Sequence, residues 1–143
     1  MSDAAVETQA LKSTPFFGAL SDEDIAEIIA MGEQTSFPEG TAIVTHGEVG
    51  DAMYVLLDGT AEVDVGGRFH RLHAGNFVGE MALLSSGRRL ATVTATAPVR
   101  ALRIPGEGFR AFLLSHPQVA VAMLQALSER LREVEQRLDA WIT

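Results

Sequence analysis

Short apolar runs separated by glycine-containing turns are the feature that most limits how this chain can fold. They extend from Thr35 to Ile104, and the turns include Asp58-Gly59 and Gly66-Gly67, both typical of β-hairpins. The strands expected between the turns are 42–45, 53–57, 60–65, 69–73, 91–95 and 99–104. Parallel α/β units would need a helix between successive strands, so this pattern predicts an antiparallel sandwich or jelly roll.

Two helices are predicted before the strands. Residues 3–12 form a short helix that Pro15 ends, and Ser21 with Asp24 forms a capping-box pattern at the start of a second helix that Gly32 ends. This pair either moves when a ligand binds or packs passively against the sheet.

After the strands, Pro117 opens a long helix whose apolar positions repeat in a heptad, at Ala120, Leu124, Leu127, Leu131, Val134, Leu138 and Trp141. This stripe either lies on the roll as a lid over a ligand or pairs with a second copy in a homodimer, and different segments could do each.

Together these elements predict an α+β fold, with an antiparallel β-roll (jelly roll) flanked by helices. We expect one domain over residues 1–143: N-terminal helices at 1–33, the roll at 34–104 and C-terminal helices at 105–143.

Composition restricts the partners. The 143 residues carry a net charge of −8, which argues against nucleic acid as a partner, because binding its backbone requires a basic face. The chain has no cysteine, no basic leader followed by an apolar core, and no run near the roughly 20 apolar residues of a membrane span. We therefore expect a cytoplasmic protein without a membrane span.

The stretch from Gly75 to Ala95 has the layout of an anion site. A helical turn starting near Glu80 would direct the backbone N–H groups of Met81, Ala82 and Leu83 at one point, where a helix N-terminus favours negative charge. Arg89 could approach the same point with a planar, permanently charged guanidinium that suits phosphate oxygens.

Glu80 does not suit a phosphate, because its carboxylate would repel one. An ionised carboxylate can accept a hydrogen bond from a sugar hydroxyl on the same ligand. Phosphate, hydroxyl and apolar surroundings together suggest a nucleotide.

Residues 77–95 resemble the phosphate-binding cassette of the cyclic nucleotide-binding domain family, which includes kinase regulatory subunits, catabolite-activator-type regulators and bacterial channels. The motif positions are Gly79, Glu80, Met81, Ala82, Arg89, Ala91 and Thr92. The resemblance implies that Glu80 accepts from the ribose 2′-hydroxyl, and that Arg89 and the two amides after Glu80 hold the cyclic phosphate.

Two residues depart from the family pattern. Arg88 stands where proline is usual, and Leu90 stands at a binding position where Ala, Ser or Thr is common. A hydroxyl there is associated with phosphate contact or with reading guanine, and Leu90 has none. The ligand expected is therefore cAMP, with cGMP second.

The resemblance also implies that Val63 and His70 face the base and that Arg130 is a lid residue that stacks on it. Val63 is equally consistent with an interior strand position, and Arg130 with a solvated helix surface. The four histidines form no closed ligand set, so no metal site is predicted.

The sequence thus predicts a cyclic nucleotide sensor that is not an enzyme, with binding coupled to the C-terminal helix and an unknown protein effector. The initiating methionine and the absence of a helix-turn-helix after Trp141 favour a stand-alone protein. The alternatives are an effector domain of a larger channel or transcription regulator, and a dimerisation module that no longer binds nucleotide.

Overall fold

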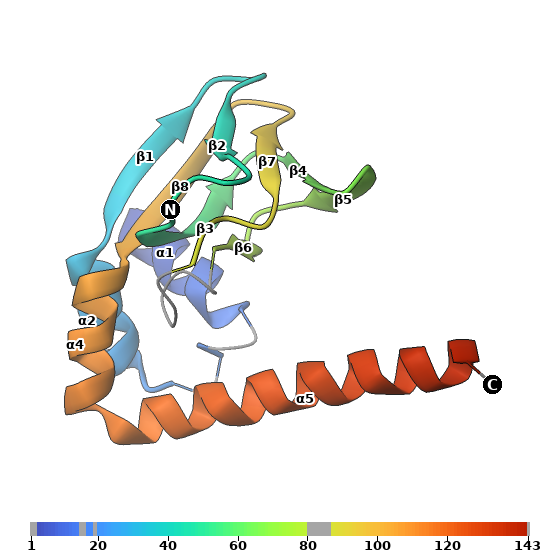
Figure 1. Ribbon diagram of the computed structural model, residues 1–143. Helices are drawn as coiled ribbons and strands as arrows, with labels where there is room; N and C mark the ends of the chain where they lie inside the picture. Colours follow the sequence, from blue (N-terminus) through green and yellow to red (C-terminus); the bar gives the residue numbers. More distant parts are fainter. Residues whose placement is uncertain (1–2, 15–16, 19, 80–86, 143) are drawn as a thin grey trace.

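The computed structural model describes residues 3–14, 17–18, 20–79 and 87–142, without the side chains of residues 3, 130 and 138–142 (Figure 1). In chain order the elements are α1 (Asp3–Lys12), α2 (Asp22–Met31), β1 (Glu33–Phe37), β2 (Ala42–Val44), β3 (Ala52–Asp58), β4 (Ala61–Val65), β5 (Arg68–Leu72), β6 (Phe77–Val78), β7 (Thr92–Ala95), β8 (Val99–Pro105), α4 (Gly106–Ser115) and α5 (Pro117–Ile142). The predicted α+β class is confirmed, with helices before and after the strands of an antiparallel roll in chain order.

The strands form two four-stranded sheets with the orders β1-β8-β3-β6 and β2-β7-β4-β5, and the paired strands are antiparallel. Gly66-Gly67 makes the expected hairpin between β4 and β5, with both glycines at positive φ. The hairpin predicted at Asp58-Gly59 is wrong, because β3 and β4 belong to different sheets. The chain crosses between sheets here, and a Cβ on Gly59 would lie 2.3 Å from the carbonyl oxygen of Pro98.

The sheet that contains β3 is covered on both faces. Met53, Val55 and Leu57 pack with the helices, whereas Leu56 packs with residues of the other sheet. Alternate side chains of a strand point to opposite faces, so β3 is apolar at nearly every position. Two strands were not predicted: β1 has a mostly exposed, polar sequence, and β6 has only two residues.

The predicted N-terminal helices form at the expected residues. The backbone N–H of Asp24 donates to Ser21 Oγ over 3.1 Å, and Gly32 ends α2. Ile25 and Ile28 of α2 are buried against the roll and α4. The hydrophobic core thus fixes the position of α2 beside the end of α4.

The C-terminal helices meet at a bend of 112°, and α5 then extends away from the sheets (Figure 1). No single described helix is long and apolar enough to cross a membrane, and only the bent pair of Gly106–Ser115 and Pro117–Arg137, taken together, has the required length and composition.

The side of α5 that packs on the core coincides only in part with the predicted heptad stripe. Val119 and Met123 are buried, whereas Leu124, Leu131 and Val134 are exposed. Leu127 of the stripe is half-buried against the same core, so in this conformation the stripe is divided between the core and solvent.

Candidate functional site

The segment that carries Arg89 is tied by its backbone to the turn before β3. The N–H of Arg89 donates to the carbonyl of Glu48 over 2.7 Å, and the N–H of Gly47 donates to the carbonyl of Arg89 over 2.9 Å. The Arg88 side chain adds a bond from Nη1 to the Gly47 carbonyl, also 2.7 Å. These bonds fix where the Arg89 side chain leaves the backbone.

The Arg89 side chain points into the protein. Its Nη2 donates to the carbonyl oxygen of Ala52, at the start of β3, over 2.7 Å. Its Nη1 is buried and has no hydrogen-bond partner among the described residues. A buried donor without an acceptor is costly, so this nitrogen is suited to an acceptor brought by a ligand.

Gly79 leaves room for the guanidinium. This residue follows β6 with a φ of +86°, in the left-handed region that favours glycine. A Cβ built on it would lie 2.1 Å from Arg89 Nη1 and 3.0 Å from the Ala52 carbonyl oxygen. Backbone conformation and space therefore both require glycine here.

The electrostatic setting of Arg89 combines burial with nearby charge. Desolvation lowers the pKa of its guanidinium, while Tyr54, Asp51 and Glu48 act in the opposite direction. An arginine keeps its charge at any ordinary pH, so the site presents a partly desolvated cation. Such a cation, with one donor unused, suits an anionic oxygen acceptor such as phosphate.

The two residues predicted to face a base are neighbours across the second sheet. Val63 of β4 and His70 of β5 are directly opposite in the antiparallel register, and Val63 is also opposite Val93 of β7. Val63 is half-buried against the core between the sheets, and His70 is exposed. Side chains at paired positions share one face of a sheet, so the two can contact one ligand.

The other predicted positions have different outcomes. Leu90 is 71% exposed, and Ala91 is half-buried. Three residues of the cassette and the side chain of the lid candidate lie outside the described part: Glu80, Met81, Ala82 and Arg130. The binding roles of all these residues stay predictions.

The sequence did not reveal how Arg89 is held. The Ala52 carbonyl and the backbone of Gly47 and Glu48 hydrogen-bond to Arg89. Every residue type except proline has these backbone groups, so the sequence does not mark which ones will bond. Gly47 and Gly50 indicate a turn in the sequence, but a turn signal does not indicate what the turn contacts.

Comparison with known proteins identifies the class. The model of the family described as "Cyclic nucleotide-binding domain" matches residues 34–116, which include Gly79 and Arg89 and the strands from β2 to β8. The chain belongs to this family, and the predicted resemblance is confirmed. It is a cyclic nucleotide-binding regulatory domain, and the buried Arg89 donor beside Gly79 fits the phosphate of such a ligand.

Individual relatives come from several kinds of protein. The chain is 34% identical over 122 residues to a cyclic nucleotide-gated potassium channel of Rhizobium etli, covering 85% of this chain and 34% of the channel. It is 34% identical over 106 residues to a cAMP-dependent protein kinase regulatory subunit of Aspergillus fumigatus, covering 72% of this chain and 26% of that protein. The solved catabolite activator protein of Thermus thermophilus has a TM-score of 0.77 at 28% identity, covering 90% of this chain and 63% of that one. The chain thus spans about a third or less of these two curated relatives.

Proposed function

We propose that this chain is a non-catalytic sensor of cyclic nucleotide, with cAMP as its preferred ligand and cGMP second. The observation that carries the proposal is the buried Arg89 Nη1, which lies beside Gly79 and has no partner among the described residues. A phosphate oxygen supplies the acceptor that this nitrogen lacks.

The proposed binding mode assigns the ligand's parts to different elements. Arg89 binds the cyclic phosphate, Glu80 accepts from the ribose hydroxyl, and Val63 and His70 contact the base. The apolar, exposed Leu90 offers no hydroxyl for guanine, which supports cAMP. The Aspergillus relative, named as a cAMP-dependent kinase subunit, supports the same choice.

The proposed output is a movement of α5. Its first turns pack on the core through Val119 and Met123, whereas the described side chains from Ser128 onward are exposed. A ligand contacted by Arg130 would favour one position of α5 by the difference in its contacts between the two positions. Amide hydrogen exchange along α5, with and without cAMP, measures this coupling.

Calorimetric titration tests the binding. A ligand of roughly two dozen heavy atoms at about 0.3 kcal/mol per atom binds with about −7 kcal/mol, in the micromolar range. Arg89→Ala should weaken cAMP binding at least a hundredfold, about 2.7 kcal/mol, because the phosphate loses its charged partner. The control is Arg110→Ala, which removes an exposed arginine of α4. Equal affinity of the Arg89 and Arg110 variants would contradict the proposal.

One observation favours an additional role in dimerisation. The apolar stripe residues Leu124, Leu131 and Val134 are exposed on α5, where a second copy could cover them. Solution mass with and without cAMP tests this, with Leu131→Glu as the variant expected to give a monomer. A dimer without cAMP binding would instead favour a dimerisation module that no longer binds nucleotide.

This domain acts either as a separate sensor or as the effector domain of a longer protein. Its relatives include a channel and a kinase subunit several times as long as the matched region. An effector domain within such a protein and a separate sensor would use the same nucleotide site, so the titration does not depend on this choice.

A further inference from the structure

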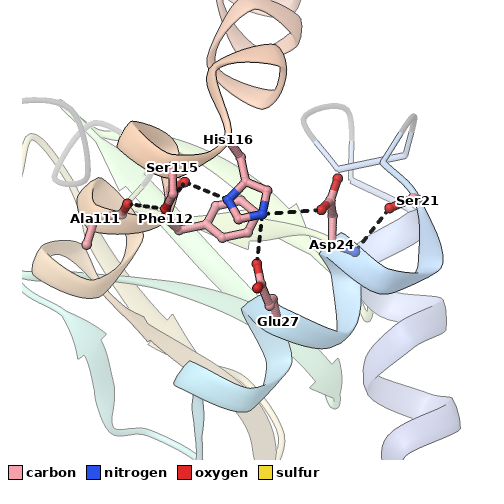
Figure 2. Close-up of polar contacts among 7 residues, drawn as sticks. All are labelled: Ser21, Asp24, Glu27, Ala111, Phe112, Ser115 and His116. Atoms are coloured by element: carbon pink, nitrogen blue, oxygen red, sulfur yellow. Dashed lines mark hydrogen bonds and ion pairs between the residues drawn. The ribbon is translucent and has the colours of Figure 1, made fainter.

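A second polar cluster lies away from Arg89, where α2 meets the junction between α4 and α5. It consists of Asp24 and Glu27, three residues apart on α2, and His116, which follows the last residue of α4 (Figure 2). Side chains three residues apart lie on the same side of a helix, and Figure 2 shows both carboxylates turned toward the imidazole. The ligand-type atoms of the three residues all lie within 4.8 Å of one another.

The orientation of the imidazole is fixed by α4. Nδ1 lies 3.0 Å from the carbonyl oxygen of Phe112, and the ring stacks on the Phe112 ring with 4.2 Å between centroids and 19° between planes. A carbonyl only accepts, so Nδ1 carries the hydrogen of this bond. In the neutral ring the lone pair is then on Nε2. A carbonyl on the far nitrogen is the usual support of a metal-binding histidine.

The Nε2 side of the ring has a surplus of acceptors. Nε2 lies 3.0 Å from Glu27 Oε2 and 3.7 Å from Asp24 Oδ1. The negative end of the α4 dipole is at the same place. With the ring neutral, its lone pair and the two carboxylates converge on one point, where a positive charge is favourable.

A proton satisfies this arrangement less well than a metal ion. A hydrogen on Nε2 can bond one carboxylate at a time, and 3.7 Å to Asp24 is too long for a hydrogen bond. A tetrahedral zinc ion with bonds of about 2.0–2.1 Å separates its ligand atoms by roughly 3.4 Å, between the two observed distances. One imidazole nitrogen and two carboxylate oxygens suit zinc-type ions, whereas Mg²⁺ and Ca²⁺ prefer oxygen ligands alone.

We propose that Asp24, Glu27 and His116 form a binding site for a divalent transition-metal cation of the zinc type. The side chains of Asp24 and His116 are 19% and 22% exposed, so solvent can reach the site and occupy a further coordination position. The ion links α2 to the junction from which α5 starts and thereby stiffens that junction. The proposal is independent of nucleotide binding.

The first test is a titration of chelator-treated, dialysed protein with Zn²⁺. We expect one ion per chain, and at least tenfold weaker binding in His116→Gln and Glu27→Gln. The matched controls are His73→Gln, which removes an exposed histidine outside the cluster, and Glu23→Gln, which removes an exposed carboxylate of the same helix as Glu27. Both controls should retain the wild-type affinity.

Co²⁺ provides a second readout. A visible absorption band as intense as that of tetrahedrally coordinated Co²⁺ should appear with one equivalent of Co²⁺. The band should be lost in His116→Gln. Circular dichroism checks that each variant is folded. Glu27 has a 55% exposed side chain, so its variant tests the site even if His116→Gln unfolds. Absence of saturable Zn²⁺ binding, or equal binding by wild type, His116→Gln and Glu27→Gln, overturns the proposal and leaves an ion pair to a protonated imidazole.

Discussion

The Arg89 site and the His116 cluster differ in which hydrogen-bonding group is in excess, donors at Arg89 and acceptors at His116. At Arg89 a buried donor, Nη1, has no acceptor among the described residues. At His116 two carboxylates converge on one ring nitrogen, so acceptors exceed donors. Buried polar groups are normally satisfied within the protein, so the unpartnered Nη1 indicates an acceptor on the ligand, while the partly exposed carboxylates at His116 concentrate negative charge at one point. An unused donor suits an anion, and unused acceptors suit a cation.

The two sites also differ in how the fold builds them. Backbone groups hold Arg89, and a glycine makes room for its guanidinium. Side chains of α2 and of the residue after α4, two helices that pack beside each other, form the His116 cluster, and Phe112 contributes a backbone oxygen. Substitutions should therefore affect the first site through shape and the second through ligand chemistry.

The largest effect is expected from Gly79→Ala. The added Cβ would collide with Arg89 Nη1 and force a strained φ, so nucleotide affinity should fall at least a hundredfold, about 2.7 kcal/mol. Gly67→Ala is a matched control, because Gly67 has a similar φ of +84° with nothing within 4 Å of the added Cβ. It should cost only about 1 kcal/mol of folding stability and leave affinity unchanged. Equal nucleotide affinity in the two variants, measured by calorimetry, would mean that Gly79 does not shape the site.

A smaller effect is expected from Arg89→Lys. Lysine keeps the charge but cannot bond the Ala52 carbonyl and a phosphate with a planar fork, so affinity should fall ten- to thirtyfold, about 1.4–2 kcal/mol. Arg110→Lys, at an exposed position on α4, should stay within threefold of wild type. If lysine at position 89 binds as tightly as arginine, the unused donor is not what recognises the ligand.

Ser21→Ala tests the His116 cluster, and its expected effects are the smallest of the three. Loss of the cap on Asp24 should lower the free energy of unfolding by about 1 kcal/mol, measured by urea denaturation. It should also weaken Zn²⁺ binding severalfold, because the first turn of α2 positions Asp24, while cAMP affinity stays the same. Ser36→Ala, in β1, serves as the control. A change in cAMP affinity without a change in Zn²⁺ affinity would contradict the claim that Ser21 supports the His116 cluster and that the two sites are independent.

The sequence predicted the roll and its helices well where local signals were strong. The capping pattern at Ser21 located α2, Pro117 located the start of α5, and Gly66-Gly67 located a hairpin. Asp58-Gly59 carries an equally strong turn signal, but a turn signal does not tell whether the next strand joins the same sheet.

The sites were predictable to different degrees. Arg89 and Gly79 could be paired because they belong to one continuous motif, although the role of the Ala52 carbonyl has no residue-type signal. The sequence predicted no metal site, and His116 is far along the chain from Asp24 and Glu27. Only the packing of α2 beside α4 brings them together. The same limit applies to α5, whose heptad did not reveal that Val119 and Met123 form its buried side.

The most direct test of the central claim is nitrogen-15 NMR of the arginine side chains during a cAMP titration. We expect the Arg89 guanidinium resonances to shift and its Nη groups to rotate more slowly as Nη1 gains a phosphate acceptor, while Arg110 is unaffected. Saturation with cAMP that leaves the Arg89 resonances unchanged would contradict the assignment of Arg89 as the phosphate-binding residue.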